Sequence, residues 1–374
     1  MIIERGEKYQ LIASLSTSPD CIRAHLAFHT ARIYHSEYVG RITGGPHTVC
    51  QDYYFALHKF MSNTPAVSII IPAYNLAAYI TETLDSVFAQ TYGDFEAIVI
   101  NDGSTDDTEA RIAPFRDRIV YIWQKNSGVM AARNAGLNAA RGRYIALLDG
   151  DDIWLPRFLE VLVGMLEADS TVSAAYPNAR YFGWPRHDGK LHQDAFPVAQ
   201  PVTFDRVLRR ECYIFGLLVF RREVIDEVGG YDESLQGQGA EDFELWLRML
   251  RHGHRFKFTR EPLAKYRWRH DSLSNTGVKI MSCEASVYEK LLQGELTGEQ
   301  REWIEAQMPE KRAQLSYACF KDELRKRRFI EAEKHLADAA EFYRQPKLAL
   351  LRAAMKVAPQ LVARIAEKMA DKKA

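Results

Sequence analysis

The sequence predicts an α/β fold, a mainly parallel sheet flanked by helices, with an α-helical extension at the C-terminal end. Short apolar runs alternate with segments of helical period between residues 67 and 148, a pattern typical of parallel strands joined by right-handed crossovers. Beyond Ser272 the composition shifts to Ala, Leu, Glu, Lys and Arg, as in packed helices. The chain has 374 residues, 47% of them hydrophobic and 26% charged, which suits one large domain and a smaller appendage.

The N-terminal segment carries the weakest pattern. Residues 1–65 show no dominant period and end in the polar run Ser62-Asn63-Thr64-Pro65, so we expect an N-terminal extension and assign it no role. From Val67 a β-branched run reaches Ile71 and stops at Pro72, which indicates a buried strand. The same reasoning predicts strands over 67–71, 97–100, 119–122 and 144–148, with helices over 76–90, from about 104, and over 128–140.

After Trp154 the elements become more varied. The pattern predicts a main domain over residues 66–280 and a helical domain over 281–374. In the main domain we expect a helix over 155–166, strands over 172–183, 215–220 and 256–268, a loop-rich stretch over 184–205 and a helix that carries Phe243 to Leu250. In the tail we expect helices over 281–293, 299–327, 329–344 and 347–369.

Composition excludes several classes of function. Lys plus Arg equals Asp plus Glu at 49 each, so a nucleic-acid partner bound through bulk positive charge is not expected. The five cysteines form no CxxC pair, which disfavours a zinc ribbon or a disulfide scaffold and favours a reducing compartment. No run has the length of a membrane-spanning helix, and the first residues lack the apolar core of a signal peptide. We therefore expect a cytoplasmic protein.

Three of the first four strands end in unusual residues. These ends read Pro72-Ala73-Tyr74-Asn75, Asn101-Asp102-Gly103 and Asp149-Gly150-Asp151-Asp152. In an open parallel sheet, ligands bind outside the carboxyl ends of the strands. The three groups are therefore predicted to share one rim and to form one site.

The acids of this rim allow two interpretations each. Asp149 and Asp151 could hold Mg²⁺ or Mn²⁺ against a diphosphate, since these cations prefer oxygen ligands, or they could cap the following helix. Asp102 could contact a nucleotide, or it could close an ordinary Asp-Gly turn. Pro72 to Tyr74 could form a shelf for a base or merely end the strand.

Other charged residues carry similar alternatives. Arg133 could clamp a phosphate or be a solvated helical charge. Glu241 and Asp242 open a helix, where acids complement the dipole, yet a carboxylate there could serve as general base; we expect the helix start to keep Asp242 ionised at neutral pH. His270 follows a strand and could be a surface histidine or a metal ligand.

Four long motifs occur together. They read VSIIIPAYNLAAYITETLDSVFAQTYGDFEAIVINDGSTDDT, NSGVMAARNAGLNAARGRYIALLDGDDIWLP, VFRREVIDEVGGYDESLQGQGAEDFELWLRML and YRWRHDSLS. In this order they resemble the family 2 glycosyltransferases, whose fold is the GT-A type. The resemblance covers about residues 66–276 and implies a GT-A-like, Rossmann-type sheet. The QxxRW signature of processive synthases is absent after the 241–251 segment, so a non-processive transferase is expected.

The resemblance also implies roles for individual residues. Asp242 corresponds to the catalytic base, with Glu241 beside it. Asp149, Asp151 and His270 correspond to the contacts of a divalent cation, Mn²⁺ or Mg²⁺, in a DxD motif. Pro72, Ala73, Tyr74, Asp102, Asn126, Arg133 and Asp149 correspond to positions that bind the nucleotide.

The implied reaction is the inverting transfer of a sugar from a nucleotide-diphosphate sugar, a UDP-sugar, to an acceptor hydroxyl. The acceptor would be a saccharide or a lipid-linked sugar, in polysaccharide or glycoconjugate biosynthesis. A different class of function is a catalytically silent sugar-nucleotide scaffold that works through its helical tail. Basic residues of that tail, Lys321 to Arg328 and Lys356 to Lys373, form either a solvated helix face or a peripheral contact with the inner face of a membrane.

Overall fold

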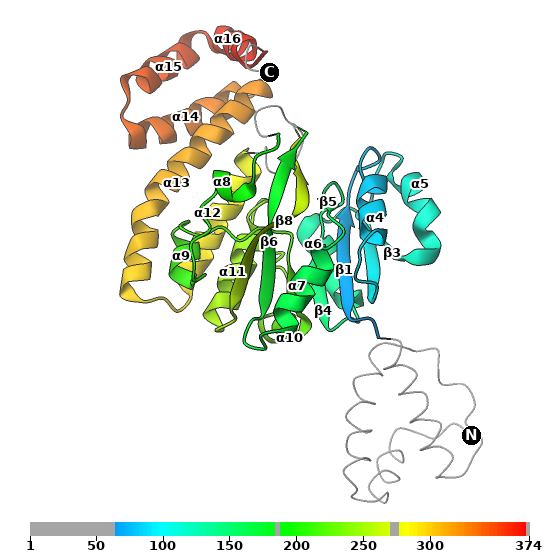
Figure 1. Cartoon of the computed structure of the whole chain (residues 1–374). Coiled ribbons are helices and arrows are strands. Elements are labelled where there is room, and N and C mark those ends of the chain that lie inside the picture. The colour runs from blue at the N-terminus through cyan, green and yellow to red at the C-terminus, as the bar shows by residue number, and fades with distance from the viewer. Residues whose placement is uncertain (1–63, 184–187, 270–276, 372–374) are drawn as a thin grey trace, which may run out of the picture. The chain divides into compact units, whose positions relative to one another are not determined.

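The computed structural model describes residues 64–183, 188–269 and 277–371. Its centre is an eight-stranded sheet in the order β3-β2-β1-β4-β7-β6-β8-β5 (Figure 1). The strands are β1 (Val67–Ala73), β2 (Phe95–Asn101), β3 (Val120–Trp123), β4 (Tyr144–Leu147), β5 (Ile153–Trp154), β6 (Ala174–Phe182), β7 (Val219–Arg221) and β8 (Phe256–Arg267).

The first half of the sheet is parallel, as predicted. β1 pairs with β2 on one side and β4 on the other, and β2 pairs with β3. β1 and β4 are buried along nearly their whole length, which explains why their sequences are continuously apolar rather than alternating. This half places the carboxyl ends of β2, β1 and β4 side by side.

The second half makes the sheet mixed. β7 is antiparallel to β4 and to β6, β5 is antiparallel to β8, and β6 is parallel to β8. The predicted α/β class with flanking helices and a helical C-terminal end is confirmed, while the later strands depart from the parallel pattern. Segment lengths could not show this, because strand direction depends on which neighbour each strand pairs with.

Helices cover the sheet and continue beyond it. Figure 1 shows α6 and α7 packed near its middle and α12 to α16 beyond β6 and β8. The helices are α4 (Ile80–Phe88), α5 (Thr108–Ile112), the 3₁₀ helix η1 (Ala113–Arg118), α6 (Val129–Ala139), α7 (Phe158–Glu167), α8 (His192–Ala195), α9 (Phe204–Leu208), α10 (Arg222–Val228), α11 (Glu241–Arg251), α12 (Gly277–Gln293), α13 (Gly298–Arg325), α14 (Phe329–Tyr343), α15 (Pro346–Val357) and α16 (Pro359–Asp371).

Two sequence predictions about helices need correction. The acids 149–152 do not cap a helix, because β5 follows them and α7 begins only at Phe158 after an N-cap at Arg157. The single helix expected over 347–369 is two helices. Ala358 leaves the helical region with φ −144° and ψ 59°, because the ring of Pro359 disfavours helical geometry in the residue before it.

Apolar side chains form two hydrophobic clusters within the described residues. The larger contains the sheet and reaches Tyr288 of α12 and Met308 of α13. The smaller joins the end of α13 to α14, α15 and α16 through Leu336, Leu348 and their neighbours. The division between the two clusters therefore falls within α13. Over the described ranges, no helix is both long enough and apolar enough to span a lipid bilayer.

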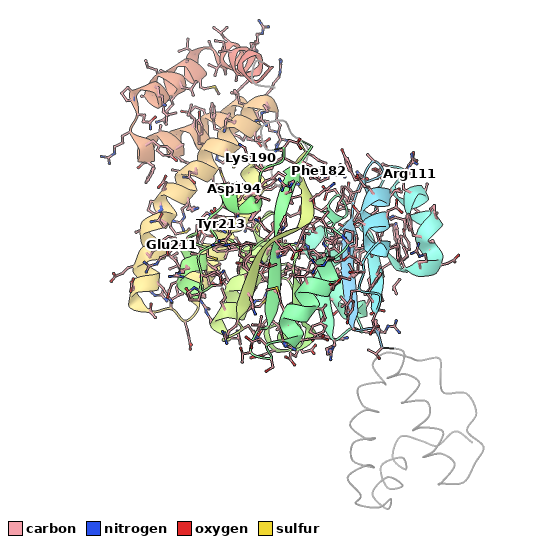
Figure 2. All side chains as sticks on the ribbon, viewed as in Figure 1. Arg111, Phe182, Lys190, Asp194, Glu211 and Tyr213 are labelled. Carbon is pink, nitrogen blue, oxygen red and sulfur yellow. The ribbon has the colours of Figure 1, made fainter. Side chains whose placement is uncertain are left out.

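The stretch expected to be loop-rich contains short helices that fold back on the sheet. The backbone N–H of Tyr181 donates to the carbonyl of Lys190 at 2.9 Å, so the chain turns back beside the end of β6. Lys190 consequently lies beside the end of β6, and Figure 2 shows Lys190 and Asp194 on the α8 side of that strand. The α8 segment thereby covers the carboxyl end of β6.

Candidate active site

The three predicted rim groups lie together in the structure. The register pairs Ala73 of β1 with Asn101 of β2, and the N–H of Asp102 donates to the Ala73 carbonyl at 2.9 Å. The loop after β4 packs onto the end of β1, since a Cβ added to Gly150 would lie 2.8 Å from the carbonyl oxygen of Pro72. Adjacent parallel strands thus bring side chains from distant parts of the sequence to one edge.

Arg133 occupies the centre of this edge. Its Nη1 lies 3.0 Å from Glu241 Oε1 and 2.9 Å from Asp242 Oδ1, and its Nη2 lies 2.8 Å from Asp149 Oδ1. The side chain is only 6% exposed, so the alternative of a solvated helical charge is wrong. A planar guanidinium presents several donors in a fixed fork, which allows one residue to hold three carboxylates from separate elements.

The position of Arg133 depends on close packing between α6 and the sheet. One turn further along α6, a Cβ on Gly136 would lie 2.5 Å from the Ile70 side chain of β1. Only a glycine lets α6 lie this close to β1. The close packing brings the preceding turn of α6, which carries Arg133, to the rim. Burial alone would lower the pKa of Arg133. Its neighbours outweigh burial and raise this pKa well above the usual value; they are Asp242, Tyr231, Asp149 and Glu241.

Asp242 has a different pKa from the one the helix start suggested. Burial, with added repulsion from Glu241 and Asp149, raises the pKa of Asp242 to about 7, although Arg133 and a hydrogen bond from Tyr231 act in the opposite direction. The direction of this shift is opposite to the one that the helix start suggested. A carboxylate with a pKa near neutrality is a stronger base than an ordinary aspartate and is half ionised near pH 7.

The two oxygens of Asp242 have distinct surroundings. Oδ1 accepts hydrogen bonds from Arg133 and, at 2.9 Å, from the Tyr231 hydroxyl. Oδ2 lies over Gly216, where an added Cβ would come within 2.8 Å of it. The Asp242 side chain is 28% exposed, and Oδ2 is the oxygen that the two donors on Oδ1 leave available to another hydroxyl.

Asp102 is buried and bound to the start of α6. Its Oδ1 accepts from Gln124 Nε2 at 2.8 Å and from the Ser127 N–H at 2.9 Å, and its Oδ2 accepts from the Gly128 N–H at 2.8 Å. These bonds differ from a local Asp-Gly turn, since they satisfy amide groups at the N-terminus of a helix. Asp102 therefore fixes α6, and with it Arg133, against the end of β2.

The acids after β4 pair with the end of β8. Arg269 Nε lies 3.1 Å from Asp151 Oδ2, and the backbone N–H of Arg267 donates to Asp152 Oδ1 at 2.8 Å. Burial and the neighbouring Asp149 raise the pKa of Asp151 to about 6, while Arg269 lowers it. Among the described residues, the Asp152 Oδ2 atom is buried without a hydrogen-bond partner.

This oxygen-only donor set has the chemistry that Mg²⁺ and Mn²⁺ select. Asp149 and Asp151 are partly exposed, with 39% and 17% of their side chains accessible. Within the described part of the chain, however, no three His, Cys, Asp or Glu side chains are grouped as a metal site. His270, the third predicted ligand, lies outside the described residues.

The remaining predicted residues line the same edge. Tyr74 is exposed beside the buried Ala73, and Pro72 is half-buried. Asn126 is exposed, and its backbone nitrogen would lie 2.7 Å from a Cβ on Gly103, which has a φ of +70°. The left-handed turn at Gly103 thus lets the loop before α6 pass close to the end of β2.

Sequence reasoning missed three residues of this site. Asp242 lies beside Tyr231 and Gly216, and Asp151 pairs with Arg269. None of these three neighbours belongs to a motif that suggests catalysis. The Gly-Gly-Tyr-Asp run at 229–232 offered a signal for Tyr231, because a tyrosine after two glycines in a loop can reach a buried partner. Nothing in the sequence marks Gly216.

Comparison with known proteins gives the class. Residues 68–229 match the family described as Glycosyl transferase family 2, and residues 190–319 match Glycosyltransferase like family 2. An uncharacterized glycosyltransferase of Rickettsia prowazekii is 31% identical over 249 residues, which cover 62% of this chain and 71% of that protein. The chain belongs to the family 2 glycosyltransferases, as its motifs predicted.

Two named relatives and one solved structure extend the comparison. TuaG of Bacillus subtilis, a glycosyltransferase assigned by its name to teichuronic acid biosynthesis, is 32% identical over 61% of this chain and 88% of its own. WfgD of Escherichia coli, named a UDP-Glc:alpha-D-GlcNAc-diphosphoundecaprenol beta-1,3-glucosyltransferase, is 33% identical over 50% of this chain and 70% of its own. The crystal structure of S. aureus TarS 1-349 superposes with a TM-score of 0.52 and 17% identity, covering 82% of this chain and 92% of that one. This last likeness concerns the fold, which is of the GT-A type.

Proposed function

We propose that the protein transfers a sugar, with inversion at the anomeric carbon, from a UDP-sugar to an acceptor hydroxyl during synthesis of a cell-surface polysaccharide or glycoconjugate. The observation that carries this proposal is the link from Asp242 to Asp149 through a single guanidinium, Arg133. Asp242, a carboxylate with a raised pKa, lies on one side of Arg133. Asp149, which we assign with Asp151 to the side of the donor diphosphate, lies on the other.

On the donor side, we assign Pro72, Ala73 and Tyr74 to the base, with Asp102 and Asn126 beside them. Tyr74 offers an exposed ring for stacking. Asp149 holds one arm of Arg133 and is the most exposed of the three carboxylates on that guanidinium. If a diphosphate oxygen replaced the Asp149 carboxylate as the partner of Nη2, Arg133 would bind the diphosphate, as the sequence suggested.

On the acceptor side, Asp242 takes the proton of the attacking hydroxyl through Oδ2. Arg133 and Tyr231 hold Oδ1 and thereby fix the direction of the other oxygen. As the acceptor oxygen bonds to the anomeric carbon, its proton passes to Asp242, and the diphosphate departs from the opposite face of the sugar. Glu241 is 5% exposed and acts by holding Arg133 rather than by touching substrate.

We propose that Asp149, Asp151 and His270 hold a Mn²⁺ or Mg²⁺ ion. When bound, such an ion offsets the negative charge that develops on the leaving diphosphate. Asp151→Ala should abolish transfer, and added Mn²⁺ should not restore it. Full activity of this variant in excess EDTA would contradict the assignment.

The name of WfgD includes a UDP-sugar donor and a diphosphoundecaprenol-linked acceptor, and TuaG is named for teichuronic acid biosynthesis. These names favour a UDP-sugar and a lipid-linked acceptor for this chain also. The division into residues 1–65, 66–280 and 281–374 is likewise proposed, and limited proteolysis with mass mapping would test it.

The decisive experiment measures released UDP from candidate UDP-sugars with and without acceptor, for the wild type and Asp242→Asn. A general base contributes about 10²- to 10⁴-fold, so the variant should lose nearly all transfer while calorimetry shows donor affinity close to wild type. Donor binding without turnover by the wild type, across all acceptors tried, would favour the silent scaffold. Wild-type turnover by the variant would remove Asp242 from the role of base.

A further inference from the structure

The solvent face of α15 is apolar. Leu350 is 72% exposed and Val357 is 86% exposed. These residues are seven apart, two turns of helix, and therefore lie on one face. Pro346, Ala353 and Ala354 on the same side are exposed as well, whereas Leu348 and Met355 point into the smaller hydrophobic cluster. The helix is therefore apolar on both its buried and its exposed side.

Lysines border this exposed face. Lys347 and Lys356 are exposed and flank the row that contains Leu350 and Val357. Lys356 lies 3.9 Å from Glu333, which also pairs with Arg352 at 2.8 Å, so one acid of α14 partly balances this side. An apolar strip bordered by lysines is the pattern of a helix that lies in the plane of a membrane surface.

The charge of the segment points to the kind of partner. Residues 344–366 contain five basic residues and no acidic one, in a chain whose basic and acidic residues balance at 49 each. α16 adds Leu361 and Ile365, four residues apart and at least half exposed, with Arg364 between them. Figure 1 shows α15 and α16 as the outermost helices of the extension.

The neighbouring helix α14 shows an ordinary solvent face. Its exposed positions include three acids and one base, Glu331, Lys334, Asp338 and Glu341. The basic run at 321–328 that attracted attention in the sequence contains two acids, Asp322 and Glu323, which pair with Lys326 and Arg328 and offset part of its charge. α15 and α16 thus combine the acid-free stretch 344–366 with four exposed large apolar side chains, Leu350, Val357, Leu361 and Ile365.

We propose that α15 and α16 dock the protein on the surface of an anionic lipid bilayer, with Leu350 and Val357 inserted among the headgroups. Apolar burial supplies the attraction to the interface, and the lysines and arginines interact with anionic headgroups, each contributing about a fivefold gain in binding. A neutral bilayer offers only the first of these terms. The proposal concerns the helical extension and does not depend on the donor, the acceptor or the metal.

The test uses the full chain and sedimentation with vesicles. Wild-type protein should bind vesicles of phosphatidylglycerol and phosphatidylcholine, bind pure phosphatidylcholine vesicles at least tenfold more weakly, and lose affinity in high salt. The double variant Leu350→Ser with Val357→Ser should bind the anionic vesicles at least tenfold more weakly than wild type. Lys347→Glu with Lys356→Glu should do the same while leaving the apolar side chains in place.

The matched control is Ile330→Ser on α14. Ile330 is 83% exposed, about as accessible as Val357, but it lies outside α15 and α16; this variant should bind as wild type does. Equal binding by wild type and both double variants, or no binding by wild type, would overturn the proposal. A third result would also overturn it: light scattering shows that the wild type is a dimer, and the Leu350/Val357 variant is a monomer with unchanged vesicle binding. The face would then join two copies of the chain.

Discussion

At the rim of the sheet, charged side chains are buried, whereas on α15 apolar side chains are exposed. Both regions reverse the usual distribution of residues between core and surface. Arg133 is 6% exposed among three carboxylates, and Val357 is 86% exposed among lysines. Each arrangement is unfavourable for the isolated protein, and the ligands proposed above, a donor and acceptor at the rim and a lipid surface at α15, would account for it.

The difference between the regions lies in how each is held. The charges of the rim compensate one another through short hydrogen bonds, so removing one leaves the others buried without a partner. Leu350 and Val357 of α15, by contrast, are mostly exposed to solvent. Substitution should therefore be severe at the rim and nearly neutral for stability on the helix.

The largest effect is expected for Arg133→Ala. Three carboxylates would lose their shared partner, and breaking a buried ion pair typically lowers the free energy of unfolding by about 3–5 kcal/mol. Without the guanidinium, the pKa of Asp242 rises further, so the folded state binds protons more tightly than the unfolded state. Stability is then lost as pH rises, and urea unfolding should show a larger deficit at pH 8 than at pH 5.5.

The control for Arg133 is Arg312→Ala, which removes an exposed pair with Glu289. Its effect on the free energy of unfolding should stay within about 1 kcal/mol. If Arg133→Ala lowered the free energy of unfolding by as little, the rim would tolerate unpaired acids. The rim and α15 would then not differ in their sensitivity to substitution.

A second, smaller effect is expected for Gly216→Ala. The new methyl group would meet Asp242 Oδ2 at 2.8 Å and turn the carboxylate away from its direction. A misplacement of about 1 Å can lower the rate about a hundredfold, so kcat should fall strongly while donor affinity stays near wild type. Gly164→Ala is the matched control, because a Cβ there meets nothing within 4 Å; unchanged kcat in Gly216→Ala would show that Oδ2 is not the working oxygen.

The third prediction concerns pH. If Asp242 must be ionised to accept a proton, kcat/KM should rise with pH through an acid limb near 7, the value to which burial raises its pKa. Tyr231→Phe removes a hydrogen bond that lowers this pKa, so the limb should move upward by about one unit. Tyr317→Phe on α13 should leave the limb in place, and an unmoved or lowered limb in Tyr231→Phe would contradict the role of Tyr231 in positioning and tuning Asp242.

The smallest effect is expected for the stability of the Leu350→Ser, Val357→Ser variant. Exposed substitutions of this kind change the free energy of unfolding by less than about 0.5 kcal/mol, so its melting temperature should match wild type. Turnover of a soluble acceptor should be unchanged too. A strong loss of stability would mean that α15 packs these residues against other groups in solution.

The sequence by itself determined the class of fold, the alternation of strands and helices, and the convergence of residues 72–74, 102 and 149–151 on one rim. It could do so because apolar periodicity reports secondary structure, and parallel strands place their carboxyl ends together. It also gave the family, through long motifs in order.

Only the tertiary structure decided how the charges combine. Arg133 is buried, Tyr231 and Gly216 distinguish the two oxygens of Asp242, and burial raises the pKa of this acid. All three follow from contacts between residues far apart in the chain. The exposed face of α15 is of the same kind, because a helix with apolar residues on two sides does not reveal from its sequence which side its neighbours cover.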